Sequence, residues 1–305
     1  LGEKAFGLDQ RDRRYEMWNS DPAGYGPGRD PLYMSFPVYF GLCQGRCYGL
    51  FFDNSYRSVF DIGQSDPTTL SFVAEGGELR YYFFYGPEPA TVLARYTELT
   101  GRMSLPAIWA LGYHQSRWSY YPESRIRQVA AEFRAREIPC DVLYFDIHYM
   151  DGYRNFTWDR RRFPNPAGLI AELAEQGFRS VALIDAGVKA DHGYAACASG
   201  LQRHVFLEYP DGSVFRGPVW PGHCYFPDFT APRARAWWAE QYAGFMRDGL
   251  AGAWNDMNEP VVMGPSSDCP PDCVRHSVEG MGGDHRAAHN VYGMQMARAT
   301  YDALL

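Results

Sequence analysis

Two carboxylates, Asp256 and Glu259, stand in the segment GAWNDMNEP at residues 252–260, directly after an apolar run. A carboxylate can attack an electrophilic carbon, exchange a proton or bind hydroxyl groups. Asp146 and Asp185 also end apolar runs, DVLYFDI and SVALIDAG. Such a set suits hydrolysis of a glycosidic bond, where one carboxylate attacks and a second acid protonates the leaving oxygen. Acid-base hydrolysis of other bonds fits these residues almost as well.

The segments that must position these groups alternate in type from about residue 104 onward. Apolar runs typical of strands cover residues 108–114, 141–147, 180–187 and 251–256. The intervening segments show helical periodicity, with Ile126, Val129, Ala130 and Phe133 at i, i+3, i+4 and i+7 after Pro122. Further helices are predicted at 167–176, from an N-cap at Thr230 to Gly249, and at 288–305.

Near-continuous apolar strands that alternate with amphipathic helices predict a parallel sheet covered by helices. A polar side chain ends each strand, and a (β/α)8 TIM barrel carries its site at the carboxyl ends of its strands. A doubly wound sheet is the alternative, but neither G-x-G-x-x-G nor GxxxxGK[ST] occurs. We therefore favour the barrel. Only four strands are visible, and half a barrel cannot close, so we expect the chain to be a fragment.

The first hundred residues have a different texture. Within residues 37–86, turn residues separate four short β-branched or aromatic runs, PVYF, YGLFFD, LSFVAE and LRYYFFYG, a pattern typical of antiparallel strands. We predict a partial N-terminal β-sandwich over residues 1–100 and the first four to five units of the barrel over 101–305.

The bulk composition excludes several classes of function. The net charge is −7, and the 29 basic residues form no stripe that could neutralise phosphates, so no nucleic-acid partner is expected. No run of about 18 apolar residues could cross a membrane, and the start lacks an export signal. The 7 cysteines are an odd number and favour reduced thiols in the cytoplasm. An oligomer is possible.

Two cysteine pairs have a spacing that could serve a metal-binding site. Cys43 and Cys47, and Cys269 and Cys273, are each separated by three residues, which is compatible with a four-thiolate zinc site. The spacing is loose and the pairs are far apart in sequence, so we favour core or loop cysteines. We expect neither a metal nor a cofactor.

The segment WNDMNEP resembles the signature of glycoside hydrolase family 31, the retaining α-glucosidases. Other segments resemble the family in the same order along the chain, and the resemblance covers essentially all of it: LGYHQSRWSYY (111–121), LYFDIHYMDGYRNFTWD (143–159), LIDAGVK (183–189), VWPGHCYFPDFT (219–230) and AHNVYG (288–293).

The resemblance implies roles for the two carboxylates of the opening segment. Asp256 matches the nucleophile that forms a covalent glucosyl enzyme. Glu259 is three residues further on, and we expect it to orient or tune the nucleophile rather than donate the proton. In a retaining pair the carboxyl groups stand about 5–5.5 Å apart across the bond, which positions on one turn seldom achieve.

The resemblance also implies a sugar-binding set. Asp146 matches an aspartate that binds the 4- and 6-hydroxyls of the terminal glucose, and the role of His148 stays open. The apolar lining would come from Trp118, Trp220, Trp254, Met257 and Val188. Asp228 could support the loop of Trp220 or cap the helix that follows, and we favour the capping role. Asp21 matches a sandwich loop residue that reaches over the barrel mouth, although turn chemistry explains it equally well.

The family's acid/base aspartate comes from later strands that this sequence does not contain. We therefore do not expect this chain alone to hydrolyse efficiently. For the whole protein, the resemblance implies an oligosaccharide substrate of maltose or isomaltose type, cleaved at its terminal non-reducing α-glucosidic bond. A transglycosylase, an α-xylosidase or a noncatalytic carbohydrate- or partner-binding relative on the same scaffold are the alternatives.

Overall fold

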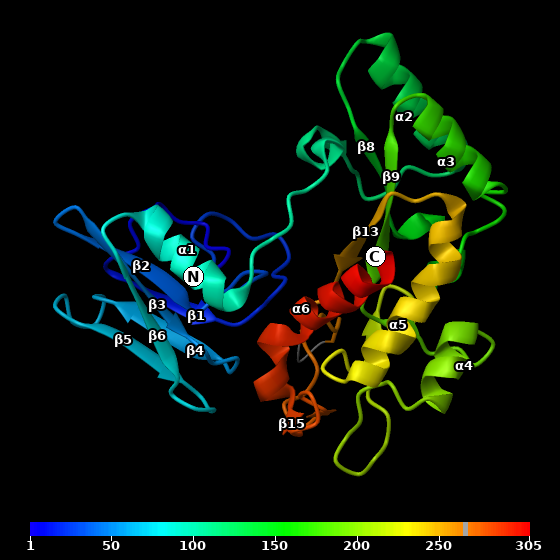
Figure 1. The fold of residues 1–305 in the computed structure, drawn as a ribbon. Coiled ribbons are helices and arrows are strands. Elements are labelled where there is room, and N and C mark those ends of the chain that lie inside the picture. The colour runs from blue at the N-terminus through cyan, green and yellow to red at the C-terminus, as the bar shows by residue number, and fades with distance from the viewer. Residues whose placement is uncertain (265–267) are drawn as a thin grey trace.

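The computed structural model describes residues 1–264 and 268–305, and its first part is a β-sandwich. Two antiparallel three-stranded sheets face each other (Figure 1): β1 (Arg13–Met17), β4 (Ser58–Ile62) and β5 (Leu70–Ala74) in the order β1-β4-β5, and β2 (Val38–Cys43), β3 (Arg46–Phe52) and β6 (Tyr81–Gly86) in the order β2-β3-β6. Tyr15, Met17 and Phe60 of the first sheet pack with Phe52 of the second. Helix α1 (Pro89–Thr100) covers the outer face of the second sheet through Val92.

The second part is built on a parallel sheet of four strands in the order β13-β9-β8-β7. Its strands are β7 (His114–Gln115), β8 (Val142–Phe145), β9 (Arg179–Asp185) and β13 (Gly252–Asp256). The major helices are α2 (Glu123–Ala135), α3 (Pro166–Glu175), α4 (Ala195–Gln202), α5 (Pro232–Phe245) and α6 (His285–Leu304). The prediction of antiparallel sheets followed by the first strands of an α/β barrel is confirmed.

Short elements fill the connections of this second part. Three antiparallel strands, β10 (Val188–Lys189), β11 (Arg216–Val219) and β12 (Gly222–Tyr225), form a small sheet in the order β10-β12-β11, and β14 (Arg275–His276) pairs with β15 (Gly283–Asp284). Single 3-10 turns occur at Ile108–Leu111, Ile147–Tyr149, Asp151–Tyr153 and Met246–Asp248.

The helices bury the faces that the sequence periodicity predicts. In α2 the buried residues are Ile126, Val129 and Ala130, with Phe133 packed against the same core.

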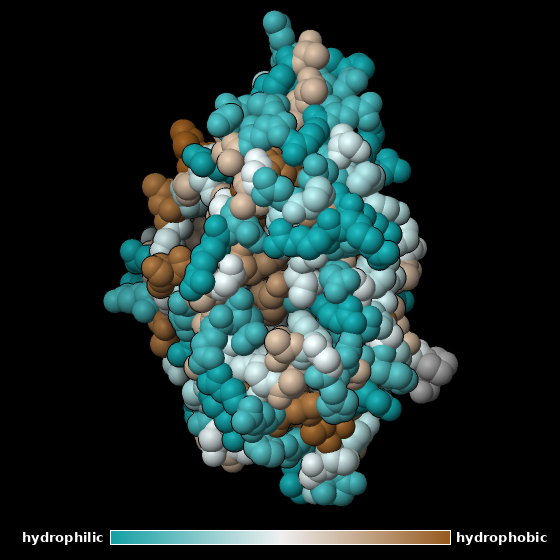
Figure 2. Space-filling model, turned by 90° about the vertical axis from the view of Figure 1, so that its right-hand side faces the viewer, coloured by the Kyte–Doolittle hydropathy of each residue, from teal (hydrophilic) through white to brown (hydrophobic). Residues whose placement is uncertain are grey.

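The face that Figure 2 turns to the viewer is largely hydrophilic, with apolar side chains gathered at its margins. None of the described helices is long and apolar enough to cross a membrane.

Two local predictions are wrong. Residues 108–114 do not form a strand: Ile108–Leu111 is a 3-10 turn with Ile108 87% exposed, and only His114 and Gln115 pair with β8. The reason is that β7 lies at an edge of the described sheet. Thr230 is not an N-cap either, because its hydroxyl donates to Asp228 and accepts from the Val278 amide, and Ala231 precedes the helix that starts at Pro232.

Strands β1 and β4 and helix α1 were not predicted. Residues Arg13–Met17 carry charges among few apolar side chains, so their alternation is short and weak. They become a strand because β4 supplies a complete antiparallel partner, from the pair Arg13 and Ile62 to the pair Met17 and Ser58.

Candidate active site

Three aspartates end three neighbouring strands of the parallel sheet. Asp146 directly follows β8, Asp185 ends β9 and Asp256 ends β13. Asp256 and Asp185 are paired in register, and the amide of Ala186 donates to the Asp256 carbonyl at 3.2 Å. Because parallel strands end at the same edge of a sheet, their carboxyl groups gather on one side of it.

A cavity of about 310 Å³ opens at this edge and is lined by Trp118, Asp146, Ile147, Trp220 and Asp256. The indole rings of Trp118 and Trp220 are 6.4 Å apart and tilted, and they are 64% and 42% exposed. Asp146 at the bottom is 9% exposed. The arrangement combines two carboxylates with two exposed apolar ring faces, which suits a ligand that has both hydroxyl and C–H surfaces.

Burial raises the pKa of every carboxyl group in this set. The pKa of Asp146 rises to about 6, chiefly through burial, and a hydrogen bond from the Ile147 amide at 2.7 Å opposes the rise. Burial also raises the pKa of Asp256, and the nearby charge of Asp21 adds to it. The charged groups that act most on these carboxyls are other carboxylates, so binding a group with hydrogen-bond donors relieves repulsion.

Asp185 is the member of this set for which no individual role was predicted. It is 2% exposed, and neither of its carboxylate oxygens has a hydrogen-bond partner among the described residues. Burial, together with the charges of Asp256 and Asp146, raises its pKa well above the usual value. Its position at a strand end was the available signal.

Glu259 lies one turn beyond Asp256, in a partly buried position. Its Oε2 atom is buried without a partner among the described residues, and burial raises its pKa to about 7, with the charges of Asp21 and Asp256 adding to the shift. Asp21, from the loop after β1, therefore acts on both acidic residues of the NDMNEP segment. The structure thus places Asp21, Asp256 and Glu259, all predicted site residues, close enough for their charges to interact.

The predicted apolar lining divides into two groups. Trp118 and Trp220 line the cavity, whereas Val188 and Met257 are buried in the core of the second part, 0% and 5% exposed. Trp254 packs edge-to-face on Tyr144, with ring centroids 5.8 Å apart. The part of these three residues in sugar binding stays a prediction.

His148 supports the rim of the cavity. Its Nδ1 atom lies 2.6 Å from the Ser119 hydroxyl, and its ring stacks on Tyr121 with centroids 4.6 Å apart. The edge of Trp118 meets the same ring at 5.9 Å. The histidine thus joins the end of β8 to the loop that carries Trp118.

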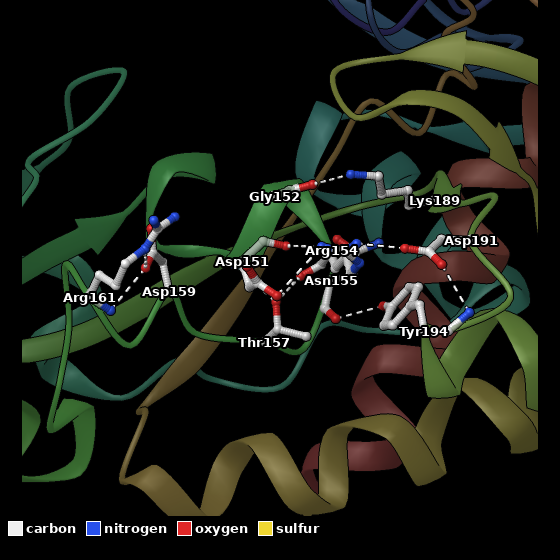
Figure 3. Close-up of polar contacts among 11 residues, drawn as sticks. Asp151, Gly152, Arg154, Asn155, Thr157, Asp159, Arg161, Lys189, Asp191 and Tyr194 are labelled. Carbon is white, nitrogen blue, oxygen red and sulfur yellow. Dashed lines mark hydrogen bonds and ion pairs between the residues drawn. The ribbon is translucent and has the colours of Figure 1, made fainter.

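The loop after β8 is fastened to the segment after β9 by side chains (Figure 3). The Asn155 amide donates to the carbonyls of Asp185 and Gly187 at 2.9 and 3.1 Å, and its oxygen accepts from the Asp185 amide at 3.1 Å. Nearby, Arg154 forms an ion pair with Asp191 at 2.5 Å. These contacts hold the backbone of Asp185, and so the end of β9, in place.

Metal-binding candidates lie elsewhere. Among the described residues, one group of His, Cys, Asp and Glu atoms is close enough to share a metal ion, and it consists of Cys269, His285 and His289. The predicted alternative of a four-thiolate site is not formed among the described residues, because Cys269 is the only one of the four cysteines in that group. Cys43 and Cys47 belong to the β2–β3 hairpin, whereas Cys269 and Cys273 follow β13.

Comparisons with known proteins agree with this architecture. Residues 103–305 match the glycosyl hydrolases family 31 TIM-barrel domain, and residues 1–61 match the family's N-terminal galactose mutarotase-like domain. The chain is 46% identical to alpha-glucosidase 2 of Bacillus thermoamyloliquefaciens over 100% of its own length and 38% of the relative's. It is 34% identical to an alpha-glucosidase of Saccharolobus solfataricus over 99% of its own length and 46% of that protein. The chain thus spans less than half of these relatives.

Two solved structures share the fold. A Flavobacterium johnsoniae dextranase of the same family, in complex with isomaltotriose, superposes with a TM-score of 0.88 at 32% identity, over 99% of this chain and 36% of that one. A family 31 alpha-glucosidase from Bacteroides thetaiotaomicron superposes with a TM-score of 0.85 at 36% identity, over 100% and 49%.

Proposed function

The chain belongs to glycoside hydrolase family 31, and from this premise we propose that the protein is a retaining exo-acting α-glucosidase. It cleaves the terminal non-reducing α-glucosidic bond of oligosaccharides of maltose or isomaltose type. The observation that carries the proposal is the cavity in which Asp146 and Asp256 face the rings of Trp118 and Trp220. The similarity to alpha-glucosidases at 46% and 34% identity supports the substrate class.

In the proposed mechanism Asp256 is the nucleophile. Its carboxylate attacks the anomeric carbon, the glycosidic C–O bond breaks, and a covalent glucosyl ester forms; water then opens the ester with overall retention. The resemblance to the family implies that the proton for the leaving oxygen comes from an aspartate on a later strand, and such assistance is worth about 10² to 10⁴ in rate. Glu259 tunes this neighbourhood by charge.

Asp146 binds the hydroxyls of the terminal sugar in this proposal. The carboxylate is fixed by the amide of Ile147 and opens into the cavity, so its free oxygen can accept from a sugar hydroxyl. Bonds to a carboxylate are about twice as strong as neutral ones. Trp118 and Trp220 would cover the apolar faces of the ring.

The proposed domains are residues 1–100 and 101–305, since α1 ends at Thr100 and the first strand of the parallel sheet follows at His114.

The proposal is tested on the full-length protein by trapping. Incubation with 5-fluoro-α-glucosyl fluoride should label one peptide, and mapping should place the label on Asp256. Asp256→Asn should remove both the label and the activity, whereas Glu259→Gln should still be labelled. A label on any other residue, or a full-length protein that is folded but neither labelled nor active on maltose and isomaltose, would contradict the proposal.

Transglycosylation on the same scaffold differs only in the second step. Product analysis with excess maltose separates the two activities, because a hydrolase gives glucose as its main product and a transglycosylase gives longer oligosaccharides. Residues that line the cavity do not discriminate between water and a second sugar as acceptor, so we propose hydrolysis on the strength of the related alpha-glucosidases.

A further inference from the structure

Three buried histidines form a row between the β-sandwich and the parallel sheet. His276 belongs to β14, and His285 and His289 begin α6, one turn apart; they are 3%, 0% and 1% exposed. Their nitrogen atoms are in contact along the row: His276 Nε2 lies 3.0 Å from His285 Nδ1, and His285 Nε2 lies 2.9 Å from His289 Nδ1.

Each end of the row meets an atom that can only accept a hydrogen bond. His289 Nε2 lies 2.7 Å from the carbonyl oxygen of Asn19, and His276 Nδ1 lies 3.4 Å from Asp228 Oδ1. Asp228 already accepts from the amides of Thr230 and Ser277 and from the Thr230 hydroxyl, so it is a carboxylate. His289 Nε2 therefore carries a hydrogen, whereas His276 Nδ1 lies near the carboxylate without forming a hydrogen bond to any described residue.

The hydrogen on His289 Nε2 fixes the tautomer of that ring, because a neutral imidazole has one N–H donor and one lone pair. Its Nδ1 atom therefore presents a lone pair toward His285 Nε2, 2.9 Å away. His285 can donate a hydrogen to this lone pair. When its hydrogen is instead on Nδ1 and donated to His276 Nε2, the Nε2 atom presents a second lone pair at the same position, and the two nitrogens can then share a cation.

The thiol of Cys269 lies beside this position. Its sulfur and one nitrogen of each of His285 and His289 all lie within 4.8 Å of one another. Cys269 is partly exposed and the two histidines are buried, so the site is reached from the cysteine side. Sulfur and imidazole nitrogen are the ligands that Zn²⁺ prefers.

We infer that Cys269, His285 and His289 bind one divalent, thiophilic metal ion, with Zn²⁺ as the expected occupant. The ligand atoms are Sγ, Nε2 and Nδ1, and a fourth position is left for water. Tetrahedral bonds of about 2.05 Å to nitrogen and 2.3 Å to sulfur separate the ligand atoms by about 3.3 to 3.6 Å. The two rings must part slightly and the sulfur must move inward, and on binding the thiol releases its proton to solvent.

The remaining contacts are those that orient metal ligands in proteins. His289 donates its other nitrogen hydrogen to a backbone carbonyl, and His285 Nδ1 contacts His276, whose own Nδ1 lies 3.4 Å from the carboxylate of Asp228. Partners of this kind fix the ring and raise the basicity of the ligating nitrogen. With the metal bound, one hydrogen remains for each of the other contacts, which are His285 with His276, His276 with Asp228, and His289 with Asn19.

The site lies where the sandwich meets α6 (Figure 1). The ring of Trp18 stacks on His289 with centroids 3.6 Å apart, and the side chain of Asn290 accepts from the Asn19 amide. Asp21 is two residues further along the same loop and acts on Asp256 and Glu259. The metal therefore fixes the base of the loop that carries Asp21 to the candidate active site.

The test is metal binding by the full-length protein, and its readout does not depend on glycosidase activity. The protein is stripped with a chelator under reducing conditions and titrated with Co²⁺, whose bond to a thiolate gives a near-ultraviolet charge-transfer band. We expect one Co²⁺ per chain with this band, displaced by one equivalent of Zn²⁺. Cys269→Ser should abolish the band and weaken Zn²⁺ binding at least tenfold.

Cys273→Ser is the matched control, because Cys273 is an exposed thiol four residues away that does not belong to the cluster. It should keep the band and the affinity of the wild-type protein. The inference is overturned if the wild-type protein shows no stoichiometric band, or if the two serine variants bind the metal equally. It is also overturned if ¹⁵N spectra in the presence of Zn²⁺ show hydrogens on both nitrogens of His285 or of His289, since that ring then has no lone pair for the metal.

Discussion

Replacement of Asn155 by alanine should loosen the end of β9 next to the candidate nucleophile. The side chain is 1% exposed and makes three hydrogen bonds, two donated to the carbonyls of Asp185 and Gly187 and one accepted from the Asp185 amide. At about 1 kcal/mol for each bond, their loss should lower the free energy of local opening by about 3 kcal/mol. That difference corresponds to about 100-fold faster exchange of the amides that this opening exposes.

The sandwich offers a matched control for this change. Asn54 also makes three bonds, donating to the carbonyls of Gly76 and Glu78 at 2.9 and 3.1 Å and accepting from the Tyr56 amide at 2.9 Å. It lies in a partly exposed turn, where water can replace the lost partners. Asn54→Ala should therefore cost only about 1 kcal/mol and leave residues 180–187 unaffected.

Hydrogen–deuterium exchange of the full-length protein measures both effects. The peptide covering residues 180–187 should exchange much faster in Asn155→Ala than in the wild type or Asn54→Ala, and kcat/KM should fall by up to about 10²-fold as Asp256 and Asp185 lose their fixed spacing. Equal exchange of this peptide in the two variants would show that Asn155 does not hold the strand end, and the reasoning from its hydrogen bonds would be refuted.

Two further predictions concern the cavity, and a third concerns Glu259 beside it. Asp146→Asn should lower kcat/KM on maltose by about 10- to 100-fold, since a charge-assisted bond is worth about 1.5–3 kcal/mol. With a substrate that lacks the 4- and 6-hydroxyls, the same substitution should lower kcat/KM little further. If the losses from the substitution and from the missing hydroxyls are instead additive, Asp146 does not contact these hydroxyls. Trp118→Ala should raise KM about 5- to 10-fold through loss of ring stacking, with a similar effect for Trp220→Ala, and unchanged kinetics in both would remove these rings from the sugar site. Because burial raises the pKa of Glu259 from 4.5 to about 7, its contribution to stability is complete below pH 4.5 and lost as the pH rises through 7. Glu259→Gln should therefore gain up to about 3 kcal/mol over the wild type between these pH values, seen as thermal midpoints that diverge with pH, whereas parallel midpoints would contradict the shift.

The strand ends and their acidic residues could be predicted because the signals are local. Each of residues 141–147, 180–187 and 251–256 combines an apolar run with a polar stop, and β8, β9 and β13 occupy these segments. The run at 108–114 looked the same, but only its last residue, His114, has a sheet partner, so tertiary context decided its structure.

The rest of the candidate site depends on contacts between distant residues. Asn155 bonds to a backbone 30 residues away, and nothing in the residues around it marks that partner. Val188 and Met257 could not be distinguished from cavity residues, because an apolar side chain at a strand end reads the same whether it faces a ligand or the core. The spacing of His285 and His289 was visible as one helical turn, but Cys269 joins them from a separate loop.

The contact between the sandwich loop and α6 has a consequence for the order of events during synthesis. The amide of Asn19 and the side chain of Asn290 are 271 residues apart in sequence. At about 5 to 20 residues per second, the ribosome needs roughly 14 to 54 s to supply the second partner after the first. The sandwich can fold during this interval, but the surface around Trp18 stays exposed to solvent until α6 has been synthesised. We expect a newly made chain to expose this surface to chaperones until residue 290 has left the exit tunnel, and the Asp21 loop to take its place only then.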